Sequence, residues 1–95
     1  MVAEMSSPLE HRAVLLEAVA EIRSTTLVEP GCLKYDFYES PFEPGKYTFV
    51  EEWESADSLR EHARTSNMAR FQERIAGKVT GSKISIHEVS STRIR

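Results

Sequence analysis

Hydrophobic residues recur with helical spacing over residues 9–22 of this chain. An apolar residue returns every three or four positions, as expected when one face of a helix is buried. The residues of this stripe are Leu9, Ala13, Leu16, Val19, Ala20 and Ile22. Just before them, Ser7-Pro8-Leu9-Glu10 has a hydroxyl that can cap a helix and a proline at the first helical position. We therefore expect a helix that starts near Leu9 and weakens at Ser24-Thr25-Thr26.

The spacing changes to that of strands after the turn Glu29-Pro30-Gly31. In the first strand, Leu33, Tyr35 and Phe37 would lie on one side, and Cys32, Lys34, Asp36 and Tyr38 on the other. In the second strand, residues 46–54, one side would carry Tyr47, Phe49, Glu51 and Trp53. Residues 40–45 between them resemble a hairpin connection, so we expect antiparallel pairing and one joint aromatic surface.

The remaining segments predict two short strands and two short helices. Residues 2–5 leave room for a short first strand, and alternating residues predict a last strand over residues 83–89. Ser55 and Thr65 are candidate caps of two helices, the second closed by Gly77. Their apolar residues are Ala56, Leu59 and Ala63 in one helix and Met68, Phe71 and Ile75 in the other.

This order of elements is the split βαβ pattern of an α+β, ferredoxin-like domain over residues 1–95. It predicts a four-stranded antiparallel sheet with every helix on one face. The open face would carry Cys32, Tyr38, Thr48, Val50 and Val89 among charged residues. Such a face is too apolar for water and too polar for a core, so it favours a homodimer formed through the open sheet face.

Charge and composition exclude several classes of function. A net charge of -3, with acidic residues spread along the chain, argues against nucleic-acid binding. No apolar run approaches the roughly 20 residues of a membrane span, and no signal-peptide pattern opens the chain. We therefore expect a cytoplasmic protein without a membrane partner. Cys32 is the only cysteine, which fits a small buried apolar residue and excludes an intrachain disulfide.

The chain also lacks the motifs of bound cofactors. The three histidines fall in three different elements, the glycines stand singly at turns, and no GxSxG motif occurs. We therefore expect a site without a metal or a nucleotide cofactor.

His62 is the candidate for acid–base chemistry. On a helix that starts near Ser55, Leu59 and His62 share a side that leans toward the aromatic strands, where Trp53 enters from the strand end. An imidazole beside an apolar wall can accept or donate a proton near neutral pH. The alternative is a histidine partly buried at a helix end, with a backbone carbonyl as its partner. The residues alone leave both readings open.

The residues around it have two readings as well. Trp53, Tyr35, Tyr47, Phe49 and Phe71 can fill a core or line a cleft. Glu51, between two aromatic residues, can form a structural salt bridge or an interface contact, or act as an acid with a raised pKa. Asn67 can cap a helix or lie on the surface, or it can orient a ligand.

Three segments together resemble the antibiotic biosynthesis monooxygenase (ABM) family. They are EPGCLKYDFY at 29–38, YTFVEEWES at 47–55 and LREHARTSNMARF at 59–71, and the resemblance spans about residues 9–86. It implies a ferredoxin-like fold, two chains packed sheet to sheet as a dimeric α+β barrel, and a pocket between sheet and helices. Members include cofactor-independent oxygenases that convert phenols or hydroquinones to quinones. Trp53 and His62 match positions that the family uses to line its pocket.

Two departures from the family pattern matter. Asn67 stands where the family often has a second histidine, which removes one candidate base. The haem-degrading branch has a tryptophan at the position of His62 and a haem-ligating histidine near Gln72; both are missing, which argues against haem degradation.

The leading hypothesis is a cofactor-free monooxygenase that oxidises a small phenolic or quinol-type substrate with molecular oxygen. His62 would accept the proton and Asn67 would orient the substrate. The substrate-binding walls would be Trp53, Tyr35, Phe49, Phe71 and Leu59. Two alternatives use the same residues: a proton-transfer isomerase acting on a small carbonyl compound, and a non-catalytic dimeric ligand-binding module.

Overall fold

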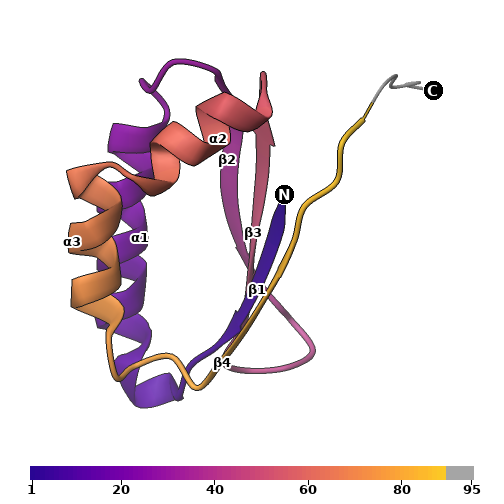
Figure 1. Ribbon diagram of the computed structural model, residues 1–95. Coiled ribbons are helices and arrows are strands. Elements are labelled where there is room, and N and C mark those ends of the chain that lie inside the picture. Colours follow the sequence, from indigo (N-terminus) through magenta and orange to yellow (C-terminus); the bar gives the residue numbers. More distant parts are fainter. Residues whose placement is uncertain (90–95) are drawn as a thin grey trace.

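A four-stranded antiparallel sheet carries the described helices on one face (Figure 1). The computed structural model describes residues 1–89. The elements are β1 (Val2–Ser6), the 3₁₀ helix η1 (Leu9–His11), α1 (Arg12–Thr26), β2 (Cys32–Glu39), β3 (Lys46–Trp53), α2 (Ala56–Ala63), α3 (Ser66–Ile75) and β4 (Gly81–Ser85). The strand order is β2-β3-β1-β4. The α+β fold and the order of its elements are confirmed, although the last strand ends at Ser85 instead of Val89.

The helix α1 starts later than its sequence pattern predicts. The expected cap is wrong: the Ser7 hydroxyl donates a hydrogen bond to the Lys78 carbonyl oxygen at 2.6 Å, and η1 has no side-chain cap. Leu9 falls in η1 and is 57% exposed. The residues of α1 that are buried are Leu15, Ala18, Val19, Ile22 and Thr26, so only part of the predicted stripe faces the sheet.

A β-bulge reverses two expected side-chain directions in β2. Cys32 pairs with Trp53 and Lys34 pairs with Glu52, which leaves Leu33 as the extra residue. Leu33 is therefore 66% exposed, and Cys32 packs against the core. The predicted sides of both residues are wrong, and Cys32 does not belong to the open face.

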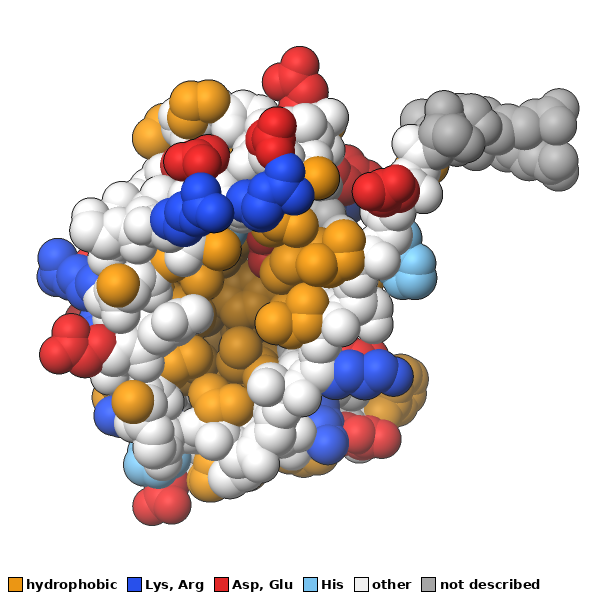
Figure 2. All heavy atoms as spheres, viewed as in Figure 1, with side chains coloured by type: hydrophobic (Ala, Val, Ile, Leu, Met, Phe, Trp, Pro, Cys, Tyr) orange, Lys and Arg blue, Asp and Glu red, His pale blue; other side chains and the backbone are white. Residues whose placement is uncertain are grey.

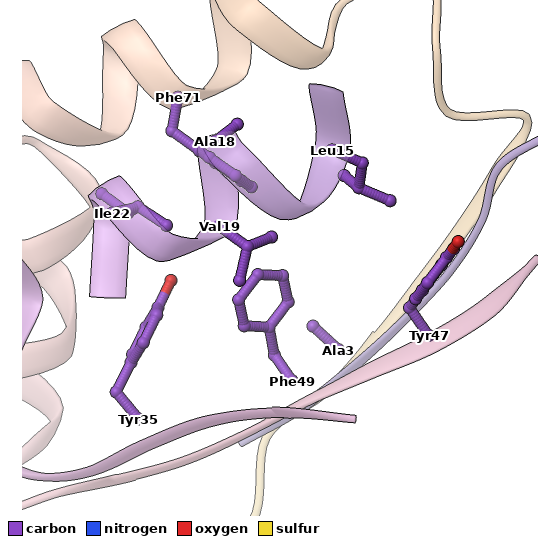
Figure 3. Close-up of a cluster of buried hydrophobic side chains, with 9 residues drawn as sticks. All are labelled: Ala3, Leu15, Ala18, Val19, Ile22, Tyr35, Tyr47, Phe49 and Phe71. Carbon is purple, nitrogen blue, oxygen red and sulfur yellow. The ribbon is translucent and has the colours of Figure 1, made fainter. Parts of the chain in front are cut away.

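The core forms where the aromatic residues of the sheet meet α1 and α3 (Figure 3). Phe49 is its centre: its ring lies 5.4 Å from that of Tyr35 and 6.0 Å, edge to face, from that of Phe71. The ring of Tyr47 stacks on that of Phe37 at 5.3 Å. The predicted aromatic surface is confirmed, and it joins the sheet to α1 and α3 in one core.

The two short helices begin at the caps that the sequence predicts. Ser55 Oγ accepts a hydrogen bond from the Ser58 amide at 3.1 Å, and Thr65 Oγ1 accepts one from the Met68 amide at 3.2 Å. In Figure 1, α2 runs over the end of β2 and β3, while α3 lies beside α1. The caps therefore fix where the polypeptide turns from the sheet into the helix that carries His62.

Truncation of α1 tests which of its faces is packed. Leu15 is fully buried, so Leu15→Ala should lower the free energy of unfolding by about 3 kcal/mol. Leu9→Ala, the same change at an exposed position, should cost less than about 0.5 kcal/mol. Urea unfolding followed by circular dichroism measures both. Equal losses would contradict the packing described above.

Candidate functional site

His62 is a buried histidine paired with a carboxylate. Its side chain is 3% exposed, and its Nδ1 lies 3.1 Å from each carboxylate oxygen of Glu29. Its ring lies 4.8 Å from the ring of Trp53 and 5.5 Å from that of Tyr35. The expectation that His62 leans toward the aromatic strands is therefore confirmed. The partner of Nδ1 is the Glu29 carboxylate and not a backbone carbonyl.

Glu29 reaches His62 because its turn is fastened to the start of α2. Gly31 has φ +83°, and a Cβ at this position would lie 2.1 Å from Ser58 Oγ, so only glycine permits this approach. The Glu54 amide donates to the Gly31 carbonyl oxygen at 2.8 Å. Sequence reasoning treated Glu29 as part of a turn signal and missed its contact with His62. The only available signal was its place in the EPGC segment of the family resemblance.

A second carboxylate is buried on the other side of Trp53. Glu51 is 3% exposed, and its Oε1 accepts a hydrogen bond from the indole Nε1 of Trp53 at 3.0 Å. Burial raises the pKa of Glu51, and the Trp53 hydrogen bond and the proximity of His62 oppose this rise. Glu51 forms no ion pair with a lysine or arginine within residues 1–89, so the predicted salt bridge is not found there. The hydrogen-bond partner of Glu51 is the Trp53 indole instead.

Tyr35 is the hydroxyl-bearing residue beside His62. Burial raises its pKa well above the ordinary tyrosine range, and the carboxylates of Glu51 and Glu29 raise it further. The Tyr35 hydroxyl therefore stays protonated at physiological pH and can donate a hydrogen bond. The Tyr35 ring thus lies beside His62, whereas its hydroxyl points toward α1 (Figure 3).

The second ring nitrogen of His62 remains free. Nε2 forms no hydrogen bond with any residue that the structure describes. Two polar side-chain atoms among residues 1–89 are fully buried without a hydrogen-bond partner, Thr26 Oγ1 and the Tyr47 hydroxyl oxygen. Nε2 of His62 is not one of them. Nε2 is therefore not fully buried, although the side chain as a whole is only 3% exposed.

The molecule is hollowed between its helices and the β4 edge of the sheet. Figure 2 shows this hollow beneath α2, with hydrophobic side chains on its floor. A groove of about 660 Å³, called the edge groove here, lies where β1 begins at Val2 and β3 continues past it to Trp53. Trp53 and Leu59 line the edge groove together with Met1, Val50 and Ile86. The ring of Trp53 is thus close to that of His62, and Trp53 also lines the edge groove.

The predicted site residues fall into three groups. His62, Trp53, Tyr35, Phe49 and Phe71 form one chain of ring contacts. Leu59 lies in the edge groove. Asn67 is exposed on α3 and borders a recess of about 10 Å³ with Ile22 and Thr25 of α1. The structure therefore assembles the predicted aromatic residues around His62 but leaves Asn67 on the α1 side of α3.

Residues 1–89 contain no group of three or more histidine, cysteine, aspartate or glutamate side chains that could hold a metal ion. None of the helices in this part of the chain is long and apolar enough to cross a membrane. The expectation of a site without a metal or cofactor stays a prediction.

Comparison with known proteins decides the family. The family model described as "Antibiotic biosynthesis monooxygenase" matches residues 1–74, which include the EPGC turn and α2. The chain belongs to the antibiotic biosynthesis monooxygenase family. The resemblance drawn from the three sequence segments is thereby confirmed.

Two relatives of this ABM protein show different coverage. The chain is 31% identical over 85 residues to "Probable quinol monooxygenase YgiN" of Escherichia coli (strain K12), covering 80% of this chain and 81% of that protein. It is 30% identical over 66 residues to an uncharacterized protein of Synechocystis sp., covering 68% of this chain. The match spans only 45% of the Synechocystis protein, which is less than half its length.

Solved structures support the ferredoxin-like fold of this ABM protein. A crystal structure of a Deinococcus radiodurans protein has a TM-score of 0.91 at 25% identity and covers 100% of this chain and 98% of that one. A crystal structure of an antibiotic biosynthesis monooxygenase has a TM-score of 0.87 at 24% identity and covers 95% and 96%. The fold is therefore shared over nearly the whole length of the chain.

The pKa of Glu51 predicts a specific dependence of stability on pH. Because its pKa is raised in the folded protein, the folded chain keeps a proton that the unfolded chain has already released. The stability of the folded state should therefore fall as the pH rises from the ordinary value of 4.5 through the raised pKa. Glu51→Gln keeps an acceptor for the Trp53 indole but should lack this decline.

Urea unfolding at several pH values above 4.5 measures the effect. Glu52→Gln is the matched control, because Glu52 is exposed and should retain the decline of the wild type. The interpretation fails if Glu51→Gln and the wild type lose stability in parallel.

Proposed function

We propose that this protein is a cofactor-independent monooxygenase that oxidises a small phenolic or quinol-type substrate with molecular oxygen. The observation that carries the proposal is His62: a buried imidazole with Glu29 on Nδ1, aromatic rings on two sides and a free Nε2. Family membership and the name of the E. coli relative support the same reaction class. A general base needs a free nitrogen that a substrate can reach, and Nε2 meets the first condition.

The reaction needs few groups from the protein. A phenol or hydroquinone with a free C–H group ortho or para to its hydroxyl takes up one oxygen molecule and yields a quinone and one water. Nε2 of His62 accepts the phenolic proton, and the resulting phenolate supplies electrons to oxygen. One oxygen atom becomes the new quinone carbonyl, and the other leaves as water with the two hydrogens of the substrate.

The hollow of Figure 2 is the proposed substrate site. Trp53, Tyr35, Phe49 and Phe71 would provide aromatic walls around a planar substrate, and Leu59 would border the entrance from the edge groove. The orienting role of Asn67 stays a prediction, and its position on the α1 side of α3 gives that role no support.

We also propose a homodimer formed through the open sheet face. No helix of residues 1–89 covers this face (Figure 1), and it combines half-buried Thr48 and Val50 with Tyr38, which is 52% exposed. Charged residues surround them, so the face has the mixed character of a subunit interface. ABM family members often dimerise, which agrees with this assignment. A cytoplasmic location belongs to the same proposal.

Removal of the imidazole tests the proposed catalyst. His62→Ala should abolish most oxygen uptake with a panel of hydroquinones, lowering kcat by about 10²–10⁴-fold, because positioned acid–base groups contribute this much. An oxygen electrode measures the rate, and circular dichroism confirms that the variant is folded. His11→Ala, which removes the histidine of η1, should keep the wild-type rate.

Full activity of folded His62→Ala would contradict the assignment of His62 as the proton acceptor. Turnover that continues without oxygen would instead favour a proton-transfer isomerase.

A charge on the open face tests the dimer. The wild type should have twice the 10.8 kDa mass of the chain, and Val50→Glu should have the mass of one chain, because the carboxylate would be buried in the interface. Val14→Glu places the same charge on the exposed side of α1 and should stay dimeric. Light scattering coupled to size-exclusion chromatography reports these masses. A monomeric wild type, or a dimeric Val50→Glu, would contradict the proposed interface.

A further inference from the structure

We propose that Glu29 is the positioning residue of the site: it holds the neutral imidazole of His62 with the proton on Nδ1, which makes Nε2 the nitrogen that accepts a proton. The kinetic consequence rests on the proposed function. The assignment of the proton to Nδ1 does not, because it follows from the contacts of the folded protein.

The geometry of the pair determines the tautomer. Both carboxylate oxygens of Glu29 lie 3.1 Å from Nδ1. An ionised carboxylate can only accept hydrogen bonds, so Nδ1 must be the donor. A neutral imidazole has one donor and one acceptor nitrogen, and Nε2 is therefore the acceptor. The side chains are 3% and 14% exposed, so water competes little for this contact.

The backbone holds Glu29 in place on both sides. The Glu29 amide donates to the Thr26 carbonyl oxygen at 2.9 Å, and the Glu29 carbonyl oxygen accepts from the Cys32 amide at 3.2 Å. Gly31 packs against Ser58 of α2, where a Cβ would not fit. The carboxylate is thus presented by a fastened turn and not by a free loop. Such rigid support is what a positioned catalytic group requires.

The surroundings of His62 favour proton transfer to Nε2. Once protonated, the ring would form an ion pair with Glu29. Glu51 lies beyond Trp53 and adds a second carboxylate to the surroundings, and Tyr35 and Cys32 are the other titratable neighbours of this cluster. The Trp53 and Tyr35 rings keep the imidazole from turning toward other partners. Glu29 therefore both orients the base and stabilises the charge that the base acquires.

Nitrogen NMR of histidine-labelled protein tests the tautomer directly. At a pH where the ring is neutral, the wild-type His62 should show a proton-bearing Nδ1 and a bare Nε2. Glu29→Ala removes the acceptor, so the proton should move largely to Nε2. Glu29→Gln retains a carbonyl oxygen and should preserve much of the wild-type signal. Glu61→Ala, which removes an exposed carboxylate next to His62 in α2, should change nothing.

Kinetics supply the second readout. Glu29→Ala should lower kcat for hydroquinone oxidation by about 10²-fold or more while KM changes little, because the base is misoriented and substrate contacts remain. Glu29→Gln should recover part of this loss, and Glu61→Ala should match the wild type. A purely structural role of Glu29 would change stability without this separation of kcat from KM.

Two results would overturn the inference: a wild-type His62 that carries its proton on Nε2, or an unchanged tautomer in folded Glu29→Ala. The wild-type spectrum decides even if the alanine variant does not fold. Failure of the proposed function is distinguishable, because a wild type without oxygen uptake would still show the predicted tautomer.

Discussion

A buried imidazole needs a hydrogen-bond partner, and Glu29 provides it for His62 from a turn that lies 33 residues earlier in the chain. This contact joins the turn before β2 to α2, which otherwise meets the sheet mainly through β3. Gly31 makes the contact possible, since any side chain at this position would collide with Ser58. The aromatic neighbours of His62, the direction of its free nitrogen and the proposed chemistry all depend on this one pairing.

Much of this fold can be predicted from the sequence, because local patterns determine it. Alternating aromatic residues identify β3, and Ser55 and Thr65 mark the starts of α2 and α3 because capping depends on residues three positions apart. The errors occur where distant contacts override local preference. The Ser7 hydroxyl binds the Lys78 carbonyl instead of capping a helix, and the bulge at Leu33 shifts the strand alternation by one residue.

The residues of the candidate site also differ in whether the sequence could predict their neighbours. His62, Trp53 and Tyr35 could be predicted as neighbours from helical and strand periodicity, because each points toward the same layer. Glu29 could not, because a turn signal says nothing about which side chain a glutamate meets across the fold. Asn67 illustrates the reverse case: it departs from the family pattern, and it is exposed at a small recess beside α1 that Phe71, one helical turn later, also lines.

A phenolic substrate should bind in the hollow with its hydroxyl on Nε2 of His62. A crystal structure of the protein soaked with a hydroquinone under anaerobic conditions tests this contact, because turnover cannot occur. We expect a ring in the hollow between the helices and the sheet, with a phenolic oxygen within about 3.2 Å of Nε2. A ring bound only in the edge groove would rule this placement out.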